Sequence, residues 1–368
     1  MNIAILNAEA GGNKGAEAML EVLIIKLVNK YPDVILYLEV GGKEKYYKDI
    51  FLKRFQNKNI KILLFRPKKI FTPYNLDIKI IDCAIDIGGI SFHGGFNQGA
   101  LRNLFRFFPF INNKIKLVFF TQDIGPSENK INTIIGRYIL SKSIGVFTRS
   151  ETSFNNLINQ FKINKSKVLG PFPDSTLLYK TSDVYDGKLK ENYVVLSPSA
   201  IMFAKHGMDY IKLFVKLYEL LKDKFQVVIL VHNFTLNFNN SDGEICSKLH
   251  NLCPTSLLIN ENISTGNLKN ILGNSKFSIS SRYHVVVGSI SQDIPSIAIG
   301  WNPKYESYLK LYNKNHWNID LGSNSFIEIK HLLENKEFTS GINDLAVFNQ
   351  TLKQNVSESF NQLFSKID

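Results

Sequence analysis

The chain has 368 residues, of which 44% are apolar, and this is enough for two domains that each bury a core of their own. Its apolar runs, such as "VVIL", are far shorter than the roughly 20 residues that a membrane-spanning helix needs, so we expect no transmembrane segment. The net charge of +12 could indicate a polyanionic partner, a phosphorylated substrate or a membrane surface. It is spread along the chain rather than gathered in a basic stripe, which argues against a nucleic-acid partner and also fits a chain that is simply rich in lysine throughout.

The N-terminal sequence and the cysteines indicate the compartment. The opening "MNIAIL" is typical of a core strand, and no secretion signal precedes it, so we expect a cytoplasmic protein. Cys83, Cys246 and Cys253 form no CxxC pair and have no histidine at zinc-finger spacing. They are predicted to be buried thiols rather than disulfide partners or metal ligands.

Apolar runs alternate with helical patterns through the first half of the chain. The runs predicted as strands cover residues 2–6, 34–40, 60–65, 81–89, 116–126 and 144–150. The first helix is predicted from apolar residues at spacings of three and four, which are Ala16, Leu20, Leu23, Ile24, Leu27 and Val28. This alternation is typical of βα units around a parallel sheet.

The pattern loosens over residues 170–192, which are rich in Pro, Asp, Gly and Lys, and a second alternating set follows. Its predicted strands cover residues 193–197, 225–233, 256–260, 276–280 and 295–301, and its predicted helices cover 209–223, 243–252, 266–273 and 282–292. We therefore predict Rossmann-like α/β domains over residues 1–185 and 186–342, both doubly wound. Residues 343–368 are predicted to form an amphipathic helix that packs back on the first domain, with Phe348, Leu352, Val356, Phe360 and Leu363 as its apolar face.

Two such domains are expected to face each other across a cleft at the carboxyl ends of their strands, where ligands bind in this type of fold. The stretch "SISSRYHVVVG" places polar residues at one such strand end. Ser281 is the predicted N-cap, and Arg282, Tyr283 and His284 would begin the helix. A helix N-terminus favours an anion and a neutral imidazole, and a guanidinium is suited to a carboxylate or phosphate. The alternative is a capped helix whose Arg282 and His284 face solvent.

A second arginine has a similar position in the first half. In "IGVFTRSETS" a predicted strand ends at Thr148, and Arg149 precedes Ser150, the predicted N-cap of the next helix. Arg149 and Arg282 could hold one small ligand that carries both a carboxylate and a phosphate. The alternative is that Arg149 forms an ion pair with Glu151 or another neighbour on the surface.

Other strand ends supply further candidate ligand contacts. The glycine-rich loop "NAEAGGNKGAEAML" contains Asn13 and Gly15 but matches neither GxGxxG nor a Walker loop. Asp174 in "GPFPDST" is predicted to cap a short helix or to bind a sugar hydroxyl. The remaining candidates are Gly89 in "IDIGG", His232 in "VILVHNF", and Asn302 and Lys304 in a loop at "GWNPK". No metal-ligand cluster or GxSxG motif is present, so we expect a site that works without a metal.

Together these motifs resemble the polysaccharide pyruvyl transferase family. The resemblance rests on "GGNKGAEAML", "DIGP", "TRSETS", "PDS" and above all "SRYH" followed by "IPSIAIGWNPK", and it covers residues 1 to about 310. It implies a fold like that of GT-B glycosyltransferases. It also implies transfer of the enolpyruvyl-derived group of phosphoenolpyruvate onto two hydroxyls of a sugar, with release of phosphate.

The resemblance assigns roles to the candidate residues. His284 would be the catalytic acid or base, and Arg149 and Arg282, with Ser281 and Tyr283 beside them, would bind the donor. The expected substrate contacts are Asn13, Gly15, Gly89, Asp174, His232, Asn302 and Lys304. No cofactor is expected, because phosphoenolpyruvate is a substrate. The acceptor would be a sugar of a surface polysaccharide or of its lipid-linked precursor, which would bring the protein into peripheral contact with the inner membrane face.

Two alternatives stay open on the sequence. One is a GT-B glycosyltransferase that uses a nucleotide sugar, although the paired glutamates of many retaining members have no counterpart around Glu306. The other is a non-catalytic carbohydrate-binding component that shares the fold.

Overall fold

The computed structural model describes residues 1–40, 51–58, 61–65, 67–69, 72–94, 98–234, 241–335, 338 and 342–368. The chain divides into two compact units. Unit 1 comprises Met1–Gly11, Ala16–Leu178 and Gln354–Asp368, and unit 2 comprises Gly12–Gly15 and Tyr179–Lys353. Unit 2 resumes at Tyr179, within the Pro- and Lys-containing stretch where the sequence pattern loosens. Within the described ranges, no helix combines the length and the apolar character needed to cross a bilayer.

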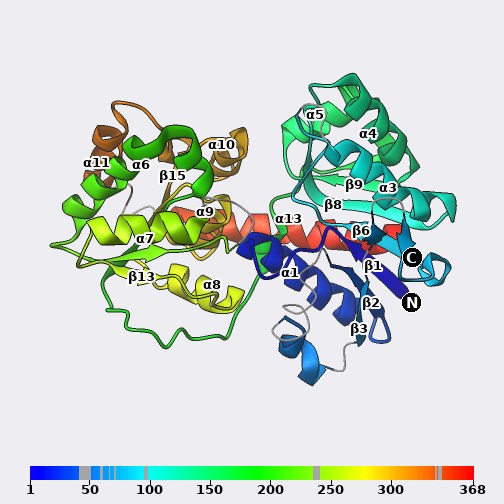
Figure 1. The fold of residues 1–368 in the computed structure, drawn as a ribbon, viewed down its shortest axis with the longest axis horizontal. Coiled ribbons are helices and arrows are strands. Elements are labelled where there is room, and N and C mark those ends of the chain that lie inside the picture. The colour runs from blue at the N-terminus through cyan, green and yellow to red at the C-terminus, as the bar shows by residue number, and fades with distance from the viewer. Residues whose placement is uncertain are drawn as a thin grey trace. The chain divides into compact units, whose positions relative to one another are not determined.

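Unit 1 is built on an eight-stranded parallel sheet (Figure 1). Seven strands follow the order β10-β9-β8-β6-β1-β2-β3, and β7 pairs with β8 beside them. Their bounds are β1 Asn2–Leu6, β2 Ile35–Glu39, β3 Lys61–Phe65, β6 Cys83–Asp86, β7 Ile90–Ser91, β8 Lys116–Ile124, β9 Gly145–Thr148 and β10 Val168–Leu169. A separate antiparallel pair joins β4 (Pro67–Lys69) to β5 (Thr72–Tyr74).

Helices cover both faces of this sheet because its strands are apolar on both sides. Their bounds are α1 Lys14–Lys30, α3 Gln98–Asn112, α4 Lys130–Lys142 and α5 Glu151–Asn159. On one face, Ala4 and Phe119 share a core with Phe107 of α3 and Ile135 of α4. On the other, Phe120 packs against Phe360 of the C-terminal helix α13 (Ile342–Ile367), with 4.8 Å between ring centroids.

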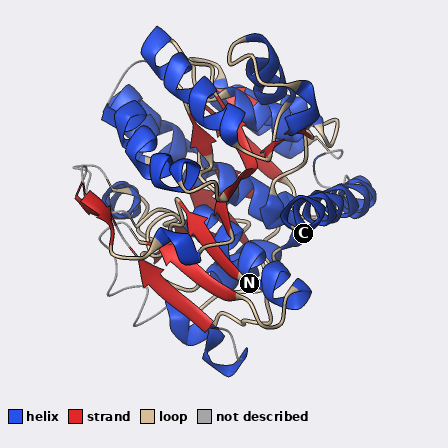
Figure 2. Cartoon of the chain, turned by 90° about the vertical axis from the view of Figure 1, so that its right-hand side faces the viewer, coloured by secondary structure: helices blue, strands red, loops and turns tan. Residues whose placement is uncertain are grey.

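Unit 2 contains a six-stranded parallel sheet of order β13-β12-β11-β14-β15-β16. The strands are β11 Tyr193–Ser197, β12 Gln226–Leu230, β13 Leu257–Ile259, β14 Ser278–Ser280, β15 Ser296–Gly300 and β16 Asn318–Asp320. The helices are α6 Ala200–Leu221, α7 Asp242–Leu252, α8 Thr265–Gly273, α9 Tyr283–Ile290, α10 Pro303–Lys310 and α11 Ser325–Glu334. Helices and strands alternate along the chain as the sequence predicted, and the two-domain α/β prediction is confirmed. Figure 2 shows the helices and the strands in different colours.

The buried residues agree with several sequence patterns. Leu352, Val356, Phe360 and Leu363 of α13 are buried, and Phe348 is half-buried. All three cysteines are buried thiols, as predicted.

Each sheet has one point where the strand order reverses. In unit 1, β2 and β3 lie on one side of β1, and β6 lies on the other side. In unit 2, β12 lies on one side of β11 and β14 on the other. Ligands in open α/β sheets bind beside the carboxyl ends of the strands at such a switch point. The residues that follow β1, β6, β11 and β14 are therefore the first candidates for a functional site.

Candidate functional site

The start of α9 lies at the switch point of unit 2. The sequence prediction of Ser281 as its N-cap is wrong, because the N-cap is Arg282, whose φ of −108° and ψ of 117° are extended. The Ser281 hydroxyl instead accepts a hydrogen bond from the Tyr210 hydroxyl at 2.8 Å. The backbone N–H of Arg282 donates to Oγ of Ser280 at 2.8 Å. Two serines thus fix the turn between β14 and α9.

The guanidinium of Arg282 is oriented by Asp242, a residue that the sequence analysis missed. Nη2 of Arg282 forms an ion pair with Oδ1 of Asp242, which is fully buried at the first position of α7. The same carboxylate accepts hydrogen bonds from the backbone N–H groups of Ala200 at 2.9 Å and Asn233 at 3.0 Å. Nε of Arg282 is buried without an acceptor among the described residues. A buried donor without an acceptor is costly, so a bound anion would stabilise this arrangement.

His284 and His232 lie side by side in unit 2. Their rings are parallel to within 6°, with 6.2 Å between centroids. His232 is buried, and burial, together with the nearby His284, Arg282 and Lys14, holds the pKa of His232 well below its usual value. His232 is therefore neutral near pH 7 and adds no positive charge beside His284.

The glycine-rich loop comes to these histidines through backbone contacts. The N–H of Phe234 donates to the carbonyl of Gly12 at 2.9 Å, and Asn13 forms an antiparallel bridge with Asn233. Oδ1 of Asn13 accepts a hydrogen bond from the N–H of Gly15 at 3.1 Å.

Gly15 then lies directly against the imidazole of His284. A Cβ at position 15 would fall inside the van der Waals contact distance of the ring. We call Gly15, His232, Asp242, Arg282 and His284 the unit 2 cluster.

Three other predicted residues of unit 2 have different surroundings. The ring of Tyr283 is buried against Tyr305 and Tyr308, so its role in donor binding stays a prediction. Asn302 is the N-cap of α10, and Lys304 lies in this helix rather than in the predicted loop. The helix forms because Pro303 favours its first turn and the Asn302 side chain accepts from the N–H of Lys304. Nζ of Lys304 lies 5.0 Å from the ring centroid of Tyr283.

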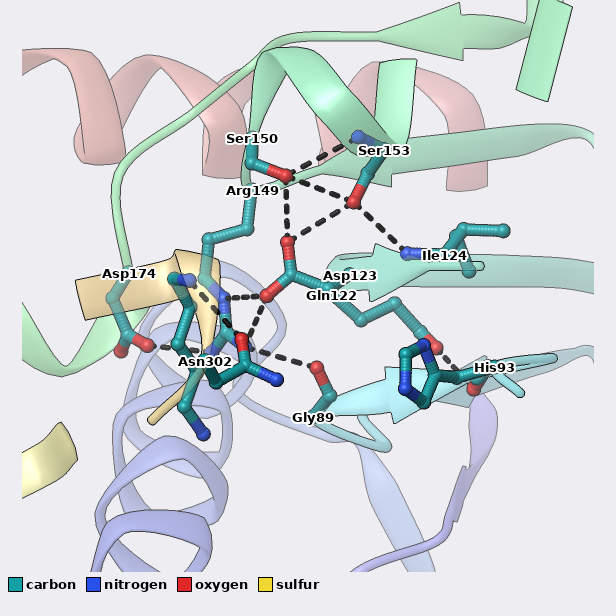
Figure 3. A network of polar contacts seen from close by, with 12 residues as sticks. Gly89, His93, Gln122, Asp123, Ile124, Arg149, Ser150, Ser153, Asp174 and Asn302 are labelled. Atoms are coloured by element: carbon teal, nitrogen blue, oxygen red, sulfur yellow. Dashed lines mark hydrogen bonds and ion pairs between the residues drawn. The ribbon is translucent and has the colours of Figure 1, made fainter. Parts of the chain in front are cut away.

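In unit 1, Arg149 forms a buried network with two aspartates (Figure 3). Nη2 and Nε of Arg149 donate to Oδ2 of Asp123 at 2.7 and 3.1 Å, and Nη1 donates to Oδ2 of Asp174 at 2.7 Å. Nη2 also donates to the carbonyl of Gly89 at 3.0 Å. The alternative of a surface ion pair with Glu151 is wrong. We call Gly89, Asp123, Arg149 and Asp174 the unit 1 cluster.

Both aspartates of this cluster have additional local bonds. Burial alone would raise the pKa of Asp123. The charge and hydrogen bonds of Arg149 and the hydrogen bonds of Ser150 and Ser153 outweigh burial and lower this pKa. Ser150 is the N-cap of α5, as predicted. Oδ1 of Asp174 accepts from the backbone N–H of Thr176 at 2.9 Å, so the prediction that Asp174 is a cap is confirmed.

Asp86 lies at the switch point of unit 1 and was also missed. Its side chain is fully buried and accepts hydrogen bonds from Asn7, from Nε2 of Gln122 at 2.8 Å and from the N–H of Gly88 at 3.0 Å. Burial outweighs these bonds and raises the pKa of Asp86 to about 6. An acidic residue at the end of an apolar strand, immediately before "IGG", was the available signal.

The two clusters differ in charge. Arg149 faces two carboxylates, so the formal charge of the unit 1 cluster is negative. Arg282 faces one carboxylate, so the formal charges of the unit 2 cluster cancel. The start of α9 also has the partial positive charge of a helix N-terminus. An anionic ligand is therefore favoured in unit 2.

One comparison shows the family of the chain, and another shows its fold. The model of the family described as polysaccharide pyruvyl transferase matches residues 13–303. None of the curated proteins matches the sequence significantly.

The chain is similar in structure to UDP-GlcNAc 2-epimerase from Neisseria meningitidis, with a TM-score of 0.60, 14% identity, and coverage of 100% of this chain and 99% of the other. The UDP-GlcNAc 2-epimerase from Methanocaldococcus jannaschii has a TM-score of 0.60, 14% identity and coverage of 94% and 98%. UGT89C1 from Arabidopsis thaliana has a TM-score of 0.58, 9% identity and coverage of 100% and 98%. At these identities the likeness concerns the fold alone, which is of the GT-B type.

Proposed function

Because the chain belongs to the polysaccharide pyruvyl transferase family, we propose that its donor is phosphoenolpyruvate and its acceptor a pair of hydroxyls on one sugar. The proposed product is a pyruvate ketal, and phosphate is released. The observation that carries this proposal is the start of α9, where Arg282, with a buried Nε that lacks an acceptor among the described residues, precedes His284 by two positions. Such a site suits a small anion that must also exchange a proton.

The reaction needs one proton donor, one proton acceptor and fixed positive charge. A proton added to the methylene carbon of the donor makes the methyl group and leaves an oxocarbenium-like carbon. The first sugar hydroxyl attacks this carbon and loses its proton. The second hydroxyl then replaces the phosphate, as the carbon–oxygen bond to phosphate breaks. The sugar loses two hydroxyl protons. One replaces the proton that was added to the methylene carbon, and the other leaves with the phosphate.

In this proposal the unit 2 cluster binds the donor. Arg282 and the N–H groups at the start of α9 hold an anionic group of the donor, and Asp242 positions Arg282. His284 supplies or accepts the proton, because imidazole changes protonation state near neutral pH. The adjacent His232 stays neutral and therefore does not oppose the protonated form of His284.

Arg149 stays the second proposed donor ligand, and its present partners set a condition on that role. Nη1 and Nη2 of Arg149 are bound to Asp174 and Asp123. To bind a donor anion through these nitrogens, Arg149 must give up part of its contact with one carboxylate. Otherwise it acts as a positioning residue that holds the two aspartates.

The acceptor is proposed to bind to residues of unit 1. Carboxylate and carbonyl oxygens accept hydrogen bonds from sugar hydroxyls, and Gly89 and Asp174 are the proposed acceptor contacts. Their oxygens already accept hydrogen bonds from Arg149, and Asp174 is buried, so a sugar hydroxyl must replace one of these bonds. Asn13, Asn302 and Lys304 of unit 2 remain proposed substrate contacts. We propose a surface-polysaccharide precursor as the acceptor, lipid-linked at the cytoplasmic face of the membrane.

The test is transfer in a defined mixture. The protein is incubated with phosphoenolpyruvate and a panel of glycosides with neighbouring hydroxyls. Phosphate release and a mass gain on the sugar are measured together. His284→Ala should abolish both, whereas His331→Ala, which removes an exposed histidine of α11, should leave both unchanged. Phosphate release without a sugar product would contradict the proposal.

Thermal shift distinguishes the proposal from the glycosyltransferase alternative. A ligand that binds the folded state raises the melting temperature by mass action. We expect phosphoenolpyruvate to raise it in the parent protein and to do so less in the Arg282→Ala variant. A shift with UDP-sugars and none with phosphoenolpyruvate would favour a glycosyltransferase. Sugar binding without turnover of any donor would favour a carbohydrate-binding component.

A further inference from the structure

Two neighbouring helices of unit 1 expose large apolar side chains to solvent. Helices α3 and α4 pack against each other over the same face of the sheet. In both helices the exposed residues recur at spacings of three and four, so each set lies on one outward side. The residues are between 38% and 64% exposed, and they are Leu101, Phe105 and Phe108 of α3 and Ile131, Ile134 and Tyr138 of α4. We call this surface the α3–α4 face.

The charges on these helices have one sign. Neither helix contains an aspartate or glutamate. Arg102, Lys130, Arg137 and Lys142 are exposed. Arg106 pairs with Glu39, and Arg137 donates to the carbonyl of Phe161 at 3.0 Å, so these two arginines have partners within the fold. The α3–α4 face is therefore apolar and aromatic, with four exposed cations.

We propose that the α3–α4 face docks peripherally on a lipid bilayer that contains anionic headgroups. Single exposed apolar residues are ordinary, but a cluster on adjacent helices marks an interaction surface. Aromatic and aliphatic side chains with flanking lysines and arginines are the pattern of helices that lie in a membrane interface. Cations near an anionic surface each add about 1 kcal/mol of attraction.

The charge also decides against a second copy of the chain as the occupant. A symmetric dimer through this face would bring together two copies of the same cationic surface. Like charges that face each other across an interface oppose association. An anionic bilayer satisfies both the apolar and the cationic side chains.

This inference goes beyond the proposed reaction, because docking requires neither donor nor acceptor. Docking is tested by co-sedimentation of the full chain with phosphatidylglycerol–phosphatidylcholine vesicles and with pure phosphatidylcholine vesicles. We expect binding to the mixed vesicles that weakens as salt increases, and at least tenfold weaker binding to the neutral vesicles.

The chain offers a matched pair of variants. Ile134 on α4 is 64% exposed and Ile327 on α11 is 65% exposed. Ile134→Ser should weaken vesicle binding about tenfold, since one buried aliphatic side chain contributes up to a few kcal/mol. Ile327→Ser should have no effect. The double variant Lys130→Glu/Lys142→Glu should weaken binding at least tenfold, and Lys276→Glu should not.

Three results would overturn the proposal. The first is the absence of binding to mixed vesicles, and the second is an equal loss in the Ile134→Ser and Ile327→Ser variants. The third is a dimer in sedimentation velocity without lipid that Ile134→Ser dissociates. Transfer to a soluble glycoside by Ile134→Ser should equal that of the parent protein, so failure of the membrane proposal is distinguishable from failure of the proposed reaction.

Discussion

The contact between Gly15 and His284 allows a test of the unit 2 cluster that depends on no substrate. The perturbation is Gly15→Ala, alone and combined with His284→Ala. A Cβ at position 15 would overlap the His284 ring, including Cγ, the ring carbon bonded to the Cβ of His284. Moving only the far end of the ring therefore does not remove the clash. The ring or the helix start must move.

Two opposing effects determine how much Gly15→Ala changes the free energy of unfolding. Extra volume at a packed site costs about 1–3 kcal/mol. Gly15 lies in the first turn of α1 without a left-handed φ, and alanine in place of glycine in a helix gains up to about 1 kcal/mol. We expect Gly15→Ala to lower the free energy of unfolding by about 1 kcal/mol in the parent protein. In the His284→Ala background the clash is gone, so the same change should raise it by about 1 kcal/mol, which gives a coupling of about 2 kcal/mol.

The assay is guanidinium-induced unfolding followed by tryptophan fluorescence. The two tryptophans of the chain, Trp301 and Trp317, both belong to unit 2, so their emission reports on the unit that contains this contact. The dependence of the free energy on denaturant must be equal in all variants for the comparison to hold. Gly322→Ala is the control, because a Cβ there meets open space. Equal effects of Gly15→Ala in both backgrounds would refute the contact.

Three further predictions concern buried charges. In the parent protein, Asp86 has a folded pKa of about 6, above the usual 3.8. The free energy of unfolding of the parent should therefore fall by about 3 kcal/mol as pH rises from about 4 to about 6, and the loss is complete above that range. The Asp86→Asn variant should lack this pH dependence. Unfolding curves of parent and variant across that range measure the difference, and equal slopes would contradict it. Asp242→Asn should raise the KM for phosphoenolpyruvate about tenfold with a smaller change in kcat, because Arg282 loses the carboxylate that orients it; steady-state kinetics decide, and an unchanged KM would show a structural role only. Arg149→Lys should lower the free energy of unfolding by about 3 kcal/mol, because a single ammonium cannot replace the guanidinium bonds and leaves the buried Asp174 under-satisfied; a loss below about 1 kcal/mol would contradict this.

Local patterns predicted the longer strands of both units because the chain's apolar periodicity is strong. They did not predict α10, α11 or β16, and α6 begins nine residues before the predicted start at residue 209. The cap of α5 was also predictable, since Ser150 bonds to an N–H three residues away. The cap of α9 was not, because the hydroxyl of Ser281 is bound by Tyr210, which lies 71 residues earlier. The preference of serine for an N-cap depends on local hydrogen bonds. A tertiary hydrogen bond of similar strength can occupy the hydroxyl and abolish this preference.

The missed aspartates illustrate the same limit. Asp242 looked like an ordinary acidic residue in the first turn of a helix, and only the fold brings Arg282 to it from 40 residues away. Asp123 lies at the end of an apolar strand, where its carboxylate meets Arg149 of the next strand end. The sequence shows that a charged residue is present at a strand end, but the pairing partner follows from sheet order.

Sheet order also explains why the carboxyl edges of the two units differ in charge. The reversal between β1 and β6 brings together Asn7 and Asp86, and the neighbouring unit 1 cluster adds two more carboxylates, so this edge is suited to neutral hydroxyls. The reversal between β11 and β14 brings the start of α9 and Arg282 to the edge of unit 2, which is suited to an anion. Helices α3 and α4 follow β6 and β8, so their first turns lie near the carboxyl edge of unit 1. A bilayer bound to the α3–α4 face would therefore lie near the edge proposed for the acceptor, as a lipid-linked sugar requires.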